Sequence, residues 1–254
     1  MKAENSYGLI SIGLCIRYFC HLSSYEKVGD LNHHLKMLDE SIHEAGFQVA
    51  ESGMQILKEA RDQLKTMSSD EKVGEKLAKE FRDSAIMFEK IVFAEATTKK
   101  VYVIPQRRFN TEYLLSNPHR LFKDGLFARL SSLAKSDIHS AGRCILFGEA
   151  TASAFHILRA TEEALKLYYF SQKKTKRLSK PMWAGMVADL RAKTRDKPPK
   201  VLLDSLDMVR VSYRNPTQHP DALYDIESAQ DLLGVCVDLI GKMASSLPEP
   251  ILPT

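Results

Sequence analysis

The sequence predicts a mainly α-helical protein, because apolar residues recur at helical spacing along most of the chain and glycine, proline and asparagine punctuate the intervals. With 254 residues, of which 44% are hydrophobic, the chain can bury a substantial core without disulfide bonds. We predict a mostly helical N-terminal region, residues 1–134, and a C-terminal helical bundle, residues 135–254.

In the N-terminal region, apolar residues at helical spacing span residues 31–64, and Gly46 and Gly53 weaken this pattern. A turn at residues 67–70 separates it from a second apolar stripe over residues 73–92. Together the two stripes predict an antiparallel helical hairpin.

A short β element is also predicted in the N-terminal region. Residues 101–104 form a β-type run that Pro105 closes, and apolar residues alternate over residues 10–16, which could supply a partner strand. The apolar stretch at residues 7–20 is short and is interrupted by Arg17. We therefore expect neither a secretion signal nor a membrane span.

The C-terminal region follows a connector over residues 105–135 and carries three further helical patterns. These cover residues 137–169, 202–213 and 225–247. We place a basic loop containing Trp183, the only tryptophan, between the first two.

Positive charge is concentrated in one stretch, although the whole chain has a formal net charge of only +4. Eleven lysines and arginines lie between Lys166 and Lys200, against two acidic residues. This stretch is either a solvated loop or a phosphate-binding rim, because clustered basic side chains attract a polyanion by releasing its counterions.

Several familiar sites are missing from the sequence, which has no phosphate-binding loop, no dinucleotide-binding glycine turn, no GxSxG elbow and no HExxH helix. The four cysteines form no CxxC pair and no His/Cys cluster at metal-ligand spacing, which indicates reduced thiols in a cytoplasmic protein. We expect no cofactor and no metal ion.

The segment from Arg214 to His219 is the strongest candidate for chemistry. On an unbroken helix, side chains five positions apart point about 140 degrees away from each other and do not converge. Pro216 should push Asn215 out of the α region, so we expect the helix to end near Arg214 and the chain to turn, which can bring His219 back beside Arg214. Asp207 is placed to orient an arginine. The alternative is an ordinary helix end with a capping loop.

This segment resembles the motif of the HEPN domain family, which has an arginine, a polar residue, three further residues and a histidine, here Arg214-Asn215-Pro216-Thr217-Gln218-His219. Residues 137–148 and 154–162 look like the opening helices of bacterial members. The resemblance covers about residues 135–247 and implies an all-α bundle that forms a homodimer, so that two motifs face one composite site. Many members are metal-independent ribonucleases acting as toxins or antiphage effectors.

The resemblance thus implies an endoribonuclease with an RNA substrate, in which Arg214, Asn215 and His219 are catalytic. His219 can remove the proton from a ribose 2'-hydroxyl or protonate the leaving 5'-oxygen, and Arg214 can hold the phosphate. The products would be a 2',3'-cyclic phosphate and a 5'-hydroxyl end. The RNA-binding candidates are Arg159, Lys173, Lys174, Lys176, Arg177 and Arg210.

Other functions stay open. The same dimer could be a non-catalytic module that binds nucleic acid or a protein partner, whereas a metal-dependent nuclease is disfavoured because no carboxylate cluster has a convincing spacing. His156, Arg159 and Glu163 share a helix face that could border the site or serve the fold. Residues 1–134 would be a regulatory or sensing half that contacts a neutralising or activating protein.

Overall fold

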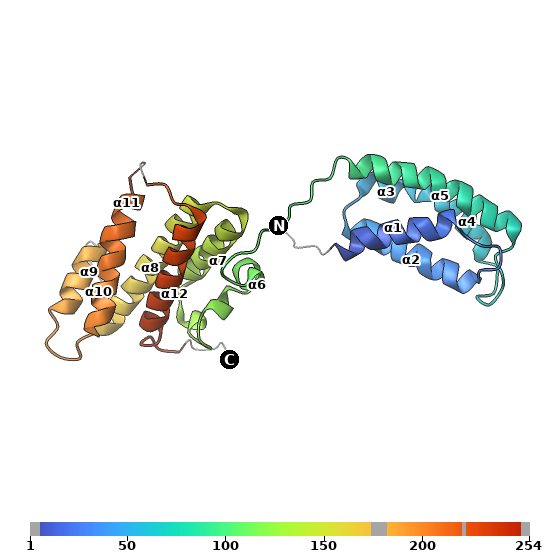
Figure 1. Cartoon of the computed structure of the whole chain (residues 1–254). Helices are drawn as coiled ribbons and strands as arrows, with labels where there is room; N and C mark the ends of the chain where they lie inside the picture. The colour runs from blue at the N-terminus through green and yellow to red at the C-terminus, as the bar shows by residue number, and fades with distance from the viewer. Residues whose placement is uncertain (1–5, 174–181, 220–221, 250–254) are drawn as a thin grey trace. The chain divides into compact units, whose positions relative to one another are not determined.

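The computed structural model describes residues 6–173, 182–219 and 222–249, and it confirms a mainly α-helical protein (Figure 1). The chain divides into two compact units, Met1–Tyr102 and Val103–Thr254. Each unit has its own cluster of buried hydrophobic residues, and the two clusters share no member. Among the described residues, no helix combines the length and the apolar character that a membrane span requires.

The N-terminal unit is a helical bundle around one apolar core. The helical pattern over residues 31–64 is divided at the two predicted weak points, since Gly46 adopts a φ of +65° and the third helix ends at Gly53. The helices are α1 (Tyr7–Cys20), α2 (Val28–Glu44), α3 (Gln48–Gly53), α4 (Gln55–Leu64) and α5 (Glu75–Ala96).

The predicted β element is wrong, because residues 10–16 lie inside α1 and residues 101–104 have no regular structure. Almost every side chain of α1 is apolar, so the alternating pattern and the helical pattern both fit its sequence. The buried side chains follow the helical spacing, as Ile12, Cys15, Ile16 and Phe19 show.

The C-terminal unit begins earlier than predicted, since residues 103–134, expected in the N-terminal region, belong to it. This segment is fastened to the last helix by Arg108, whose backbone N–H donates to Gln230 Oε1 at 2.7 Å and whose guanidinium pairs with Asp231. The elements of the unit are α6 (Thr111–Leu115), η1 (Pro118–Leu121), η2 (Phe127–Arg129), α7 (Ser132–Phe147), α8 (Ala150–Lys173), α9 (Trp183–Arg191), α10 (Lys200–Val209), η3 (Arg210–Arg214), α11 (Asn215–Thr217) and α12 (Ile226–Ala244).

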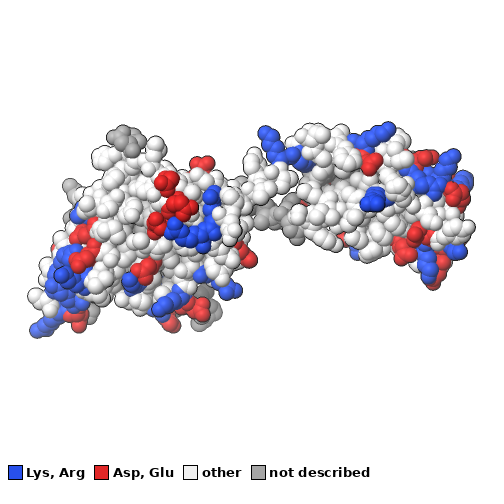
Figure 2. Space-filling view, in the orientation of Figure 1, with Lys and Arg blue, Asp and Glu red and all other residues white. Residues whose placement is uncertain are grey.

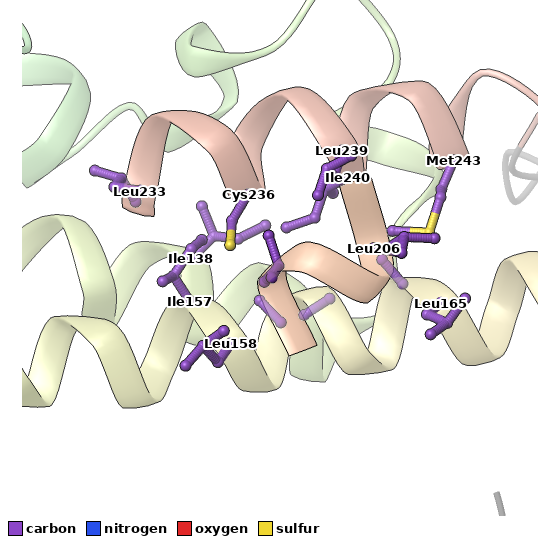
Figure 3. Close-up of a cluster of buried hydrophobic side chains, with 14 of the residues drawn as sticks. Ile138, Ile157, Leu158, Leu165, Leu206, Leu233, Cys236, Leu239, Ile240 and Met243 are labelled. Carbon is purple, nitrogen blue, oxygen red and sulfur yellow. The ribbon is translucent and has the colours of Figure 1, made fainter. Parts of the chain in front are cut away.

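The core of this unit lies where α12 packs against α7 and α8 (Figure 3). Cys236 is fully buried there, and burial raises the pKa of its thiol to about 12, so the thiol stays protonated. Trp183 begins α9 and does not lie in a loop, because its buried indole N–H donates to the carbonyl of Leu206 at 3.1 Å. The core thus holds α8 and α10 in fixed positions, and the candidate site lies on α8 and on the helical turns that follow α10.

Candidate functional site

The chain around Arg214 stays helical for longer than the sequence suggests. After α10 it continues through a π-helical turn, η3, and then α11. The expected helix end at Arg214 is wrong, since Asn215 has a φ of −65° and a ψ of −50°, inside the α region. Pro216 has no N–H, and in an α-helix its ring would clash with the carbonyl of Ser212. The wider π turn accommodates the proline without ending the helix.

A buried hydroxyl holds the turn that follows. Thr217 is 1% exposed, and its Oγ1 donates to the carbonyl of Tyr213 at 2.6 Å and lies 2.7 Å from the hydroxyl of Tyr224. The backbone N–H of Tyr224 in turn donates to Thr151 Oγ1 at 3.2 Å. These contacts attach α11 to the first turn of α8.

Arg214 is half-buried against α8. Its Nη2 lies 3.5 Å from Glu162 Oε2, and both side chains are partly shielded from solvent. Its Nε is buried and has no hydrogen-bond partner within the described ranges. Glu162 therefore fixes one end of the guanidinium, whereas other donor positions remain for a ligand oxygen.

Asn215 and His219 are both exposed, in contrast to Arg214. The backbone N–H of His219 donates to the carbonyl of Pro216 at 2.9 Å, which places the histidine in the turn directly after α11. Within the described part of the chain, its ring makes no hydrogen bond or ion pair, including none with Arg214. The ring is thus free to meet a ligand or another chain.

Arg210 belongs to a charge network on α9 and α10. Its Nε lies 3.2 Å from Asp207 Oδ1, which confirms that Asp207 orients an arginine. Asp207 and Asp204 also hold Arg191 at 2.9 and 2.6 Å, and these hydrogen bonds raise the pKa of Arg191. Because two carboxylates share two guanidinium groups, this network offers little free positive charge to RNA.

Arg159 lies in a second ionic cluster, which joins α7 to α8. The carboxylate of Asp137 is only 6% exposed, and its Oδ1 lies 2.8 Å from His156 Nδ1. Its Oδ2 lies 3.3 Å from Arg159 Nε, within ion-pair distance but outside good hydrogen-bond geometry. Glu163, predicted on the same face, instead accepts from Ser131 Oγ and pairs with Lys166.

The exposed basic residues between α9 and α10 lie away from the Arg214 segment. Of its RNA-binding candidates, Lys173 ends α8, whereas Lys174, Lys176 and Arg177 lie outside the described residues. Figure 2 shows Lys and Arg side chains gathered at the end of the unit where α9 connects to α10, and the exposed ones there include Arg195, Lys197 and Lys200. Lys200 and Arg214 are fourteen residues apart on one nearly continuous helix, about 20 Å along its axis.

The sequence does not predict the acidic partners of Arg214 and Arg159. Glu162 and Asp137 become neighbours of these arginines only when the chain folds. Within the described residues, no group of three or more His, Cys, Asp or Glu side chains is placed to hold a metal ion. Comparisons with protein-family models, with curated proteins and with solved structures give no match. The site is therefore interpreted from its own geometry.

Proposed function

We propose that the C-terminal unit is a metal-independent endoribonuclease of the HEPN type, acting as a toxin or antiphage effector. The observation that carries the proposal is the state of Arg214, a half-buried guanidinium that Glu162 contacts at one terminal nitrogen and whose other terminal nitrogen has no partner among the described residues. A charged donor without a protein partner is available to a phosphate oxygen. The role in defence rests on the resemblance alone.

In the proposed reaction, Arg214 binds the scissile phosphate and stabilises the negative charge that develops on it. His219 takes the proton from the ribose 2'-hydroxyl or gives one to the leaving 5'-oxygen, and the exposed amide of Asn215 donates to the phosphate. The 2'-oxygen forms its bond to phosphorus as the bond to the 5'-oxygen breaks, which leaves a 2',3'-cyclic phosphate and a 5'-hydroxyl. DNA has no 2'-hydroxyl and would not be cut by this route.

The reaction needs an acid and a base, and one protomer presents a single histidine in the motif. A homodimer in which two motifs face each other would supply the second. The exposure of His219, and the lack of an orienting partner among the described residues of its own chain, support this arrangement.

The N-terminal unit would serve a neutralising or activating protein partner. Support comes from α1, which exposes Ile10 at 56% and Leu14 at 61%. Figure 2 shows a largely uncharged area over this helix. Apolar side chains gathered on a surface favour protein contacts.

A second candidate function is a non-catalytic module that binds RNA or protein. It is favoured by the same freedom of the His219 ring, since a catalytic histidine usually has a fixed neighbour that sets its tautomer. The network around Asp207 also reduces the positive charge beside the motif. In such a module, Arg214 would still bind phosphate, but no bond would break.

The experiment that separates the two functions is cleavage of a mixed RNA pool in EDTA by wild-type protein, Arg214→Ala and His219→Ala, with identification of the product ends. Cyclic-phosphate ends from the wild type alone support the nuclease. Intact RNA that is retained by wild type and His219→Ala, but released by Arg214→Ala, supports the binding module. Cleavage that requires a metal ion or survives both substitutions contradicts the proposed chemistry.

A further inference from the structure

One strip of α8 brings an exposed aromatic ring, a cation and the Arg214 contact into line. Phe155, Arg159 and Glu162 are spaced at i, i+4 and i+7, so they follow one another along one face of the helix. Phe155 is 42% exposed and the side chain of Arg159 is 59% exposed. Glu162, at the end of the strip, is the residue that Arg214 touches.

The cation in this strip lies beside a buried carboxylate. Asp137 on α7 is only 6% exposed; its Oδ1 is hydrogen-bonded to His156 Nδ1, and its Oδ2 lies at ion-pair distance, 3.3 Å, from Arg159 Nε. A buried negative charge is costly unless opposite charge is close, so it attracts the guanidinium of Arg159 as well as the His156 ring. Asp137 engages the inner nitrogen of each, and within the described residues the terminal nitrogens of Arg159 and Nε2 of His156 have no protein partner.

The spacing along α8 brings Arg159 near the residue that Arg214 contacts. Arg159 and Glu162 are separated by about 4.5 Å of helix rise, so an anion on Arg159 would lie close to an anion on Arg214. The two nearby carboxylates repel the RNA backbone only weakly, because each is paired with a cation. Glu162 pairs with Arg214, and Glu163 pairs with Lys166. Phe155 lies one turn beyond Arg159, where a base attached to the same backbone could stack.

We propose that Phe155, together with His156 and Arg159 beside Asp137, binds the nucleotide next to the scissile phosphate of a single-stranded RNA. Arg159 and His156 contact its phosphate, and Phe155 stacks on its base. The inference rests on the proposed function only in assigning Arg214 to a neighbouring phosphate. In this arrangement the bound RNA strand runs along α8, from Arg214 toward the N-terminal end of the helix.

The test measures binding of a short single-stranded RNA to the His219→Ala protein, so that cleavage does not interfere. Arg159→Ala should weaken binding and reduce the slope of log affinity against log salt by about 0.7, the value for one lost phosphate contact. Arg159→Lys should restore the slope. The matched control is Arg120→Ala, which removes an exposed cation on η1 and should leave RNA affinity unchanged.

Stacking is tested separately with an RNA that carries the fluorescent base 2-aminopurine. Phe155→Ala should weaken binding at least about fivefold and remove the quenching that stacking produces, whereas Phe155→Tyr should keep both. Unchanged affinity, slope and quenching in the Arg159 and Phe155 variants would overturn the inference. A change in the sedimentation of these variants, with RNA affinity unchanged, would also overturn the inference and make this strip an interface between copies of the chain.

These binding measurements test the subsite whether or not the protein cuts RNA. An effect of Arg159→Ala on binding, in a protein whose wild type never cleaves, would support the subsite and remove the nuclease proposal. If the wild type cleaves RNA but its RNA affinity does not depend on Arg159 or Phe155, the nuclease proposal is supported and the subsite is ruled out. Failure of wild type and His219→Ala to bind any RNA would overturn both.

Discussion

Thr217 is the side chain on which the local geometry of the motif turn depends most, because its hydroxyl is buried and joins Tyr213 to Tyr224. Thr217→Val keeps the shape but removes the buried hydroxyl, so that only the long hydrogen bond of 3.4 Å from the Tyr224 hydroxyl to the Tyr213 carbonyl remains. We expect the C-terminal unit to lose about 1–3 kcal/mol in free energy of unfolding, and RNA cleavage to fall as His219 is displaced. Urea unfolding and cleavage assays measure the two effects.

A matched control is Thr161→Val. Thr161 is also fully buried and also donates to a carbonyl four residues earlier, that of Ile157, but this bond lies within the regular helix α8. We expect a smaller loss of stability and normal cleavage. Equal losses in the two variants would show that the Thr217 hydroxyl has no special part in the motif turn.

The same residues mark the limit of what the sequence predicts about the site. The spacing of Arg214 and His219 is visible in the chain itself, and so is the placement of Asp207 one turn before Arg210. The contact of Arg214 with Glu162 joins positions far apart in sequence. It could not be predicted, because it depends on how α8 packs beside the π-helical turn.

At the scale of the element, the π-helical turn η3 is the feature with the clearest consequence for function. Pro216→Ala supplies an N–H and removes the clashing ring, so a regular α-helix becomes possible. Regular helix would rotate Arg214 away from Glu162. We expect the melting temperature to stay the same or rise, while RNA cleavage falls at least about tenfold.

The control for this prediction is Pro199→Ala, at the exposed residue that precedes α10. It removes the same restriction on the unfolded chain without touching the π turn, so cleavage should persist. Normal cleavage by Pro216→Ala would show that the π turn is not needed for catalysis.

Glu95 on α5 determines how firmly the short helix α3 is held. Its buried carboxylate accepts from the backbone N–H of Ala50 at 2.8 Å and lies 3.6 Å from Lys99. Burial alone would raise its pKa, but the hydrogen bonds from Ala50 and the two preceding N–H groups, together with Lys99, outweigh burial and lower it. The helix N-terminus favours the same charged form.

A lowered pKa makes the stability of the N-terminal unit depend on acid pH. The contribution of Glu95 is complete above the ordinary glutamate pKa of about 4.3, and it is lost as the pH falls toward the lower pKa of the folded state. We expect Glu95→Gln to lower the free energy of unfolding at pH 7. The variant should also lose less of this free energy than the wild type as the pH falls. Urea unfolding from pH 7 to pH 3 measures both, with Asp70→Asn, in an exposed ion pair, as the control. A variant with the wild-type pH profile would contradict this account.

The periodicity of apolar residues predicts the long helices well. It fails where nearly all residues are apolar, or where tertiary packing determines the secondary structure. Stripes over residues 31–64 and 73–92 correspond to observed helices, because polar residues separate their apolar positions. In α1 nearly all side chains are apolar, so the period is ambiguous. In α9 the basic surroundings suggest a loop, but burial of Trp183 holds the segment as a helix.

At the scale of the whole molecule, the described residues form two separate hydrophobic cores. Composition and length allow either one domain or two, and the sequence places the boundary too late because the connector's short helices have little periodicity of their own. Their attachment to α12 through Arg108 is again a contact between distant segments. Separate cores imply that each unit can unfold without the other.

This independence predicts how core substitutions act. Leu38 and Leu233 are each fully buried, the first in the N-terminal core and the second in the C-terminal core. Either change to alanine should cost about 2–5 kcal/mol in its own unit. In calorimetry, Leu38→Ala should lower one of two transitions and Leu233→Ala the other. Below its lowered transition, Leu38→Ala should cleave RNA at the wild-type rate, because the proposed site uses only residues of the C-terminal unit. A single transition moved by both substitutions would mean that the units unfold together, and any loss of cleavage in Leu38→Ala would then follow from stability.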